Sequence, residues 1–225
     1  MRSGIGHRAS GIGLLAAALI AAACTDSTVQ ECLESNATAY PVNLPGDTSN
    51  VFRWPAAHQP VRVYAEPTGE LAANVDAAIT LWLGAFRCGE LSVQRVTDSA
   101  VADIIVRNPP QAPALRMPQR AMFADSTTAC EGETRVDSLD LEDNIYLPFR
   151  VYVTPAGIDA AETAACYRFV TAHELGHTLG LFEHSTAPED LMFHTPFRRA
   201  LSLNDRYTIQ LLYHRSAVSM VPLPR

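Results

Sequence analysis

Two histidines and a glutamate occupy the spacing of a metal-dependent hydrolase between residues 173 and 180. His173 and His177 are four residues apart, so on a helix they share one face, one turn apart, and can bind the same metal ion. Glu174 can reach a water molecule on that ion and accept its proton. Zinc in a catalytic site needs a third protein ligand and keeps its fourth position for water and substrate. Gly180 suits the end of the helix, because glycine enters the left-handed backbone region at little cost.

This stretch resembles the signature of the metzincin clan of zinc peptidases, HExxHxxGxxH followed by a turn that contains a methionine, the Met-turn. Here the third histidine, His184, comes one residue later than in the signature, and Glu183 occupies the usual position of the third ligand. The run from His184 to Met192 has the spacing of the corresponding run in matrixins, one branch of the clan. We therefore expect His184 to be the third ligand, with Glu183 as the alternative. The resemblance implies that Met192 forms a hydrophobic floor below the ligands.

The resemblance to matrixins covers residues 52–213. Residues 201–213 look like the helix that closes the matrixin catalytic domain, with Ser202 as a good N-cap and Asp205 as its capping-box partner. The resemblance implies an α/β (α+β) fold. This fold has a twisted, mostly parallel five-stranded sheet packed on helices, an active-site helix, and a small C-terminal subdomain with the closing helix.

Apolar patterning predicts the elements that position these side chains. Alternating or β-rich stretches predict strands at residues 59–64, 91–96, 101–107, 132–136 and 149–153. Val75, Ile79 and Trp82 fall at helical spacing and predict a core-packing helix over residues 71–87. Thr163 is a candidate cap for the helix that carries the site. Prolines between residues 109 and 118 predict irregular structure there.

The N-terminus has the layout of an export signal, with two arginines before an apolar run that ends in small residues. We expect residues 1–23 to be the signal peptide, residues 24–50 a flexible polar tether, and residues 51–225 the catalytic domain. Cys24 is a candidate lipidation site of a bacterial cell envelope lipoprotein. The alternative is ordinary cleavage after Ala23 and secretion.

Cysteine parity favours the lipoprotein, because the chain has five cysteines and lipidation of Cys24 leaves an even number. Four cysteines can form two disulfides in an oxidising compartment. Three connectivities are possible, and we prefer Cys32–Cys88 with Cys130–Cys166. The first pair would tie the tether to the first helix, and the second would tie the middle loop to the active-site helix.

The formal net charge of −7 argues against nucleic acids and anionic lipid surfaces as partners. We expect a monomer that acts on protein or peptide substrates and contacts the membrane only through a lipid anchor. Four acidic residues could bind calcium, although a solvated acidic loop is the favoured interpretation: Asp137, Asp140, Glu142 and Asp143.

These observations predict a zinc-dependent endopeptidase with one catalytic zinc ion. His173, His177 and His184 would bind the metal, and Glu174 would be the general base. Two alternatives differ in function. One is a zinc amidase that acts on non-peptide substrates. The other is a non-catalytic envelope lipoprotein that uses a relict zinc-peptidase fold for binding.

Overall fold

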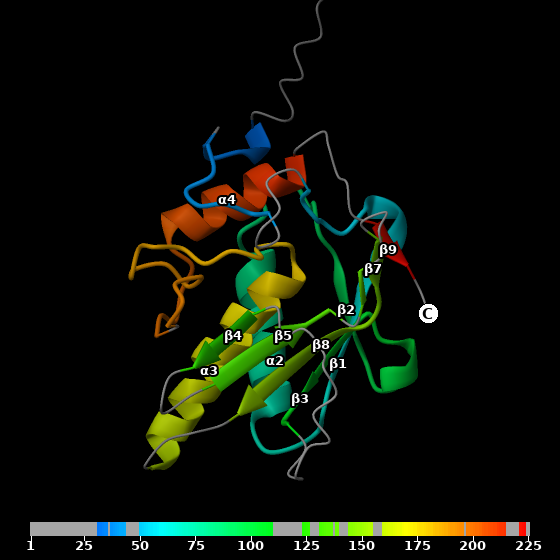
Figure 1. Cartoon of the computed structure of the whole chain (residues 1–225), viewed down its shortest axis with the longest axis vertical. Coiled ribbons are helices and arrows are strands. Elements are labelled where there is room, and N and C mark those ends of the chain that lie inside the picture. The colour runs from blue at the N-terminus through cyan, green and yellow to red at the C-terminus, as the bar shows by residue number, and fades with distance from the viewer. Residues whose placement is uncertain are drawn as a thin grey trace, which may run out of the picture.

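A six-stranded sheet forms the centre of the molecule, with the strand order β2-β1-β3-β8-β5-β4 (Figure 1). The computed structural model describes residues 31–35, 37–43, 50–109, 123–126, 131–136, 138–139, 144–154, 159–195, 197–214 and 221–223. The strands are β1 (Val61–Ala65), β2 (Val93–Val96), β3 (Ile104–Arg107), β4 (Phe123–Ser126), β5 (Glu131–Arg135) and β8 (Phe149–Thr154). Strands β2, β1, β3 and β8 are parallel, whereas β5 runs antiparallel to β8 and β4.

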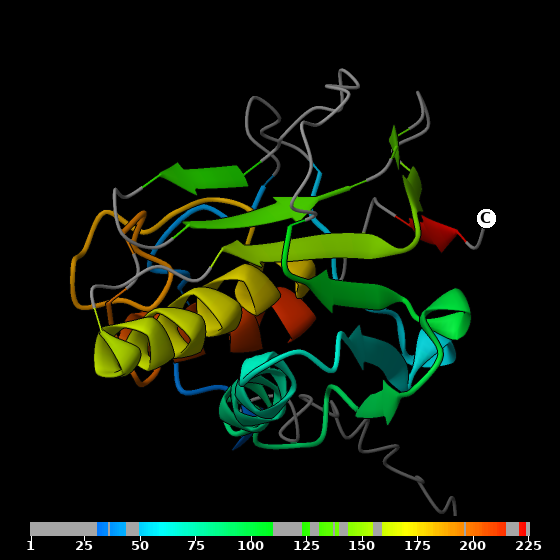
Figure 2. The same ribbon diagram turned by 90° about the horizontal axis from the view of Figure 1, so that it is seen from below.

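Two helices, α2 (Leu71–Leu83) and α3 (Ala160–Thr178), cover the same face of this sheet (Figure 2). The third helix, α4 (Leu203–His214), closes the chain beyond the long loop that follows α3. Two 3-10 turns precede strands of the sheet: η1 (Ala56–His58) comes before β1, and η2 (Ser99–Val101) comes before β3. A second, three-stranded sheet joins β6 (Ser138–Leu139), β7 (Asn144–Tyr146) and β9 (Val221–Leu223).

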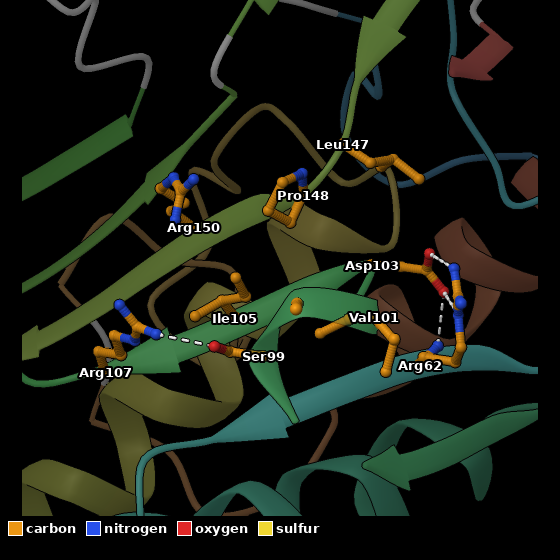
Figure 3. A pocket seen from close by; sticks show the side chains of 11 residues that line it. Arg62, Ser99, Val101, Asp103, Ile105, Arg107, Leu147, Pro148 and Arg150 are labelled. Carbon is orange, nitrogen blue, oxygen red and sulfur yellow. Dashed lines mark hydrogen bonds and ion pairs between the residues drawn. The ribbon is translucent and has the colours of Figure 1, made fainter. Parts of the chain in front are cut away.

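Side chains alternate along the strands between the helix-covered face and the opposite face. In β1 and β8 every second residue, beginning with Val61 and Phe149, is buried, as expected for strands with one packed face. Aromatic rings of Phe52, Trp54 and Phe149 contact one another in the core. The residues between the buried ones along β1 and β8, such as Arg62 and Arg150, therefore lie on the sheet face away from α2 and α3, where they line a pocket (Figure 3).

The predicted α/β fold with a mostly parallel sheet is confirmed, and each predicted strand and helix is present. The sheet has one strand more than expected, because β4 pairs with the outer edge of β5. The proline-rich composition ahead of it masked this short strand. The predicted cap of α3 was wrong by four residues. Asp159 is the N-cap and accepts a hydrogen bond from the Glu162 N–H at 2.8 Å, while Thr163 binds the Asp159 carbonyl.

Part of the expected tether packs on the folded domain. Tyr40 and Val42 are buried, and the N–H of Ala39 donates to the Thr208 hydroxyl on α4 at 3.0 Å. The predicted disulfide Cys32–Cys88 is present and attaches this segment beyond the end of α2. Residues around 31–43 thus belong to the folded unit. Figure 1 shows this blue segment beside α4.

Two further predictions concern residues that the structure does not describe. Cys130, of the predicted pair Cys130–Cys166, lies outside the described residues, as does Cys24. Among the described helices, none combines the length and the hydropathy needed to cross a membrane.

Candidate metal centre

Helix α3 carries the first two histidines in its buried C-terminal half. From Val170 to Thr178 every residue is buried between the sheet, α2 and the loop that follows. Two tryptophans hold this half in place. The indole N–H of Trp82 donates to the Ala172 carbonyl at 2.8 Å, and that of Trp54 donates to the Thr178 carbonyl at 2.9 Å. The second bond satisfies a carbonyl in the last turn, which has no partner within the helix.

The three predicted histidine ligands converge on one point. The Nε2 atom of His173 lies 3.1 Å from Nε2 of His177 and 3.2 Å from Nε2 of His184. Their ligand atoms all lie within 4.8 Å of one another. Zinc–nitrogen bonds are about 2.0–2.1 Å long, so a single ion placed among these atoms can bind all three. Three imidazoles with an open fourth position form the donor set of a catalytic zinc site.

Backbone carbonyls orient the first two rings. The Nδ1 atom of His173 lies 2.8 Å from the Leu191 carbonyl, and Nδ1 of His177 lies 2.7 Å from the Leu181 carbonyl. Because a carbonyl only accepts, each Nδ1 carries the proton and each Nε2 presents its lone pair to the centre. The surroundings therefore select the tautomer that binds metal.

Gly180 reverses the chain so that His184 can reach the other two histidines. Its φ of +103° lies in the left-handed region, and a side chain there would overlap the Phe52 carbonyl. The N–H of Leu181 returns to the Gly176 carbonyl at 3.2 Å and closes the helix end. The predicted role of Gly180 is confirmed, and the extra residue before His184 is accommodated.

Two buried carboxylates fix the loop from Ser185 to Met192. Asp190 accepts a hydrogen bond from the Ser185 hydroxyl at 2.5 Å. Asp205 accepts from the N–H groups of Leu191 and Met192 at 2.7 and 3.3 Å. Hydrogen bonds to buried charged acceptors are stronger than neutral ones, so these carboxylates hold the loop that returns past His184.

The predicted capping box of α4 is also present. The N–H of Asp205 donates to the Ser202 hydroxyl at 3.0 Å, and the N–H of Ser202 donates to the Asp205 carboxylate at 2.9 Å. The Tyr40 hydroxyl donates to the same carboxylate at 2.9 Å. Burial, together with the charge of Asp205, raises the pKa of Tyr40 above its ordinary value, so this phenol remains a donor.

Met192 is fully buried and packs its sulfur on Gly176. Gly176 lies directly before His177, so the sulfur touches the helix segment that carries the ligands. A side chain at Gly176 would meet both Met192 and Trp82. This close approach explains why a glycine suits position 176 in this chain.

Glu174 is buried against β5, and this contact was not predicted from the sequence. The Thr134 hydroxyl donates to Oε2 of Glu174 at 2.6 Å and lies 3.0 Å from the Glu174 carbonyl. Gly132, two residues earlier, passes so close that a side chain would overlap the Glu174 carboxylate and Val170. Alternation along β5 could have placed both residues on the helix-facing side, but not beside Glu174.

The remaining candidates lie apart from the three histidines or outside the described residues. Glu183 is half-buried and is not in the histidine group. His194, two residues after Met192, is exposed, and its Nδ1 atom lies 2.9 Å from the Thr195 hydroxyl. Phe197 is 44% exposed. The candidate calcium ligands lie outside the described residues: Asp137, Asp140, Glu142 and Asp143.

Comparison with known proteins agrees with this geometry. The family model for matrixin, peptidase M10, matches residues 71–214, which is more than half of the 225-residue chain. The matched range runs from the start of α2 to the end of α4 and includes the three histidines and Glu174. No curated protein gives a significant match.

Proposed function

The chain belongs to the matrixin family, and from this premise we propose that it is a zinc-dependent endopeptidase. Membership supports a zinc metallopeptidase with protein or peptide substrates in general terms. The proposal goes further by assigning the residues. His173, His177 and His184 bind zinc, and Glu174 is the general base. The observation that carries the proposal is the convergence of three imidazole Nε2 atoms, those of His177 and His184 lying 3.1 and 3.2 Å from that of His173.

The choice of His184 over Glu183 rests on two observations. The ligand atom of His184 belongs to the cluster, and that of Glu183 does not. The left-handed turn at Gly180 and the anchored loop after Ser185 direct the backbone so that the later residue faces α3. The one-residue extension thus shifts the ligand along the sequence while the donor set remains three histidines.

The chain's own residues supply the proton transfer. Zinc held by His173, His177 and His184 would acidify a water molecule and polarise the carbonyl of the scissile bond. Glu174 accepts a proton at its carboxylate during attack and passes it to the leaving amine. Thr134 holds that carboxylate through Oε2, so the base keeps one orientation. Because Glu174 is buried, its carboxylate has little contact with bulk water.

Metal stoichiometry tests the ligand assignment directly. Wild-type protein, His184→Ala and Glu183→Ala would be purified, dialysed against trace zinc and assayed for bound metal. We expect one zinc ion per chain in wild type and Glu183→Ala, and less than a tenth of that in His184→Ala. Loss of zinc in Glu183→Ala alone would show that Glu183, not His184, is the third ligand. A wild-type protein without zinc would favour the binding protein with a relict fold.

A peptide library tests the activity. The peptidase proposal predicts cleavage within peptides by wild type, and a fall of about 10²–10⁴-fold in Glu174→Ala at unchanged zinc content, which is the typical contribution of a positioned general base. Cleavage of amides but not of peptides would favour the zinc amidase instead. If the zinc-bound protein cleaved neither peptides nor amides, the non-catalytic alternative would be favoured.

We also propose that the protein is exported and anchored in a bacterial cell envelope through Cys24. The Cys32–Cys88 disulfide supports an oxidising compartment, and the signal-like N-terminus supports export. Mass spectrometry of the mature N-terminus tests the anchor. Lipid on Cys24 in wild type, lost in Cys24→Ser, is the expected result, whereas cleavage after Ala23 without lipid would make the protein a secreted one.

A further inference from the structure

A second group of metal-ligating side chains gathers at the Cys32–Cys88 disulfide and shares no residue with the three histidines of the metal centre. The ligand atoms of Cys32, Glu90 and His214 all lie within 4.8 Å of one another. Cys88, the disulfide partner of Cys32, precedes Glu90 by two residues. Two sulfurs, one carboxylate and one imidazole therefore meet at one place in the fold.

The residues of this group come from three segments that are far apart in the sequence. Cys32 belongs to the N-terminal segment that packs on α4, and His214 is the last residue of α4. Cys88 and Glu90 belong to the loop between α2 and β2. A link at this point therefore joins the N-terminal segment to the ends of α2 and α4.

Glu90 and His214 already face each other in this group. Oε1 of Glu90 lies 2.9 Å from Nε2 of His214, and the two side chains are only 8% and 16% exposed. The N–H of Cys88 donates to the other oxygen of the Glu90 carboxylate at 2.9 Å. The carboxylate is thus held by the imidazole on one side and by the backbone of a disulfide residue on the other.

The spacing of Glu90 and His214 suits a bound zinc ion. Two zinc bonds of about 2.0–2.1 Å at a tetrahedral angle place their donor atoms roughly 3.3 Å apart. The 2.9 Å between Oε1 and Nε2 therefore has to lengthen only slightly when an ion takes the place of the proton between them. The Nε2 atoms of the histidine centre, at 3.1 and 3.2 Å, are similarly close.

The oxidation state of the two cysteines decides whether the sulfurs can bind metal, because zinc binds thiolates. A dithiol reductant converts the disulfide into two thiols by donating two electrons and two protons, and it becomes a disulfide itself. Cys88 is exposed, so a reductant can approach the bond from its side. Zinc binding then releases both thiol protons and holds the sulfurs as thiolates.

We propose that reduction of the Cys32–Cys88 disulfide creates a second zinc site, whose four ligands are the two thiolates, Glu90 and His214. Four protein ligands fill a tetrahedral shell, which is the form of a structural zinc site and leaves no position for substrate. The ion replaces the disulfide as the link between the N-terminal segment and the ends of α2 and α4. This site is independent of the proposed peptidase activity.

Zinc content of the full chain before and after reduction tests the proposal without a peptidase assay. A water-soluble phosphine is the reductant, because it adds no thiol of its own: it takes the oxygen of one water molecule and leaves as the phosphine oxide. We expect one more zinc ion per chain in reduced wild type than in oxidised wild type. Failure of the histidine assignment would remove the ion bound before reduction, whereas failure of this proposal would remove only the increment.

Cobalt(II) in place of zinc reports the type of ligand. Thiolate ligands give Co²⁺ an intense charge-transfer absorption in the near ultraviolet, which a site of three imidazoles does not give. We expect this absorption only after reduction. It should be absent from Cys88→Ser, a result that also excludes the other cysteines of the chain as its source.

Variants that keep both cysteines test the other two ligands. His214→Ala and Glu90→Gln should each weaken binding of the additional zinc about ten-fold or more, since even a group that only orients a ligand contributes about 10–100-fold to metal affinity. His194→Ala removes an exposed histidine outside the group and should leave the increment unchanged.

Circular dichroism of each reduced sample, with and without zinc, shows whether it is folded. The proposal is overturned if reduction adds no zinc to wild type, or if the increment persists undiminished in Cys88→Ser or His214→Ala. A reduced wild type that remains unfolded in the presence of zinc would overturn it as well.

Discussion

The Thr134 hydroxyl on β5 and the Glu174 carboxylate on α3 form a hydrogen bond of 2.6 Å between two buried side chains. A hydroxyl has one proton to donate, and the carboxylate is the closer of its two acceptors, the other being the Glu174 carbonyl. The sheet therefore orients the residue that we propose as the general base. Helix geometry alone fixes the backbone of Glu174 but leaves several rotamers open to its side chain.

Removal of this hydroxyl should lower activity without loss of metal. We expect Thr134→Val to reduce kcat/KM by about ten-fold or more, because a hydrogen bond to a charged group contributes about 1.5–3 kcal/mol. Thr134→Ser, which keeps the donor, should retain most of the activity. Steady-state kinetics on a peptide, with zinc measured in the same samples, provide the check. Equal activity of wild type and Thr134→Val would show that Thr134 does not orient the base.

Gly132→Ala should be more harmful than its small size suggests. The new methyl group would overlap the Glu174 carboxylate and Val170, so the base, the strand or the helix has to move. Overpacking of a core costs about 1–3 kcal/mol, and we expect a comparable loss in unfolding free energy together with a fall in kcat/KM. Gly84→Ala is the control, since Gly84 has helical dihedrals and is exposed. Denaturant unfolding should show at most a small change there.

The segment before residue 51 should contribute to stability. Tyr40 and Val42 are buried, and the Tyr40 hydroxyl binds Asp205. Tyr40→Phe removes only that bond and should cost about 1 kcal/mol. A chain that begins at residue 51 loses both side chains and the disulfide, and it should unfold several kcal/mol more easily than one that begins at residue 31. Urea unfolding of Tyr40→Phe and of the chains that begin at residues 31 and 51 measures these differences. Equal unfolding midpoints would show that the segment acts only as a tether.

Asp103 should make stability depend on pH in the acid range. Burial alone would raise the pKa of its carboxyl, but hydrogen bonds from Arg62 and His58 lower the pKa below its ordinary value. A lowered pKa in the folded state means that the stabilisation is complete above about pH 4. It is lost as the pH falls through the folded value.

Asp103→Asn tests this linkage. Asp103 is buried but the side chain of its partner Arg62 is 43% exposed, so solvent screens the pair and the variant should be less stable than wild type by about 1.5–3 kcal/mol at pH 7, the contribution of a hydrogen bond to a charged group. The difference should remain constant to about pH 5 and shrink below pH 4. A difference that grew on acidification would contradict the assigned sign.

The local patterns were sufficient for the three helices, for five strands of the six-stranded sheet and for the histidine motif. His173 and His177 follow from helical spacing, Gly180 from its conformational freedom, and the α4 cap from Ser202 and Asp205. Each of these features depends on residues close together in the chain. Local physical rules determine them before any tertiary packing is known.

The contacts that orient the site residues join positions far apart in the sequence. Thr134 is forty residues from Glu174, and the pairing of β5 with β8 brings them together. No periodicity in either segment encodes that distance. The packing of Tyr40 on α4 was missed for a similar reason, because a polar, proline-containing composition concealed two buried side chains. Short β4, likewise, is specified by its partner strand more than by its own residues.

The two indole hydrogen bonds to α3 have a spectroscopic consequence. Trp54 and Trp82 are the only tryptophans in the chain, and both are fully buried against the helix that carries His173 and His177. All indole fluorescence of the protein therefore originates beside that helix. An emission spectrum of the unlabelled protein is a direct optical readout of the scaffold around the histidines, suited to following its assembly in real time.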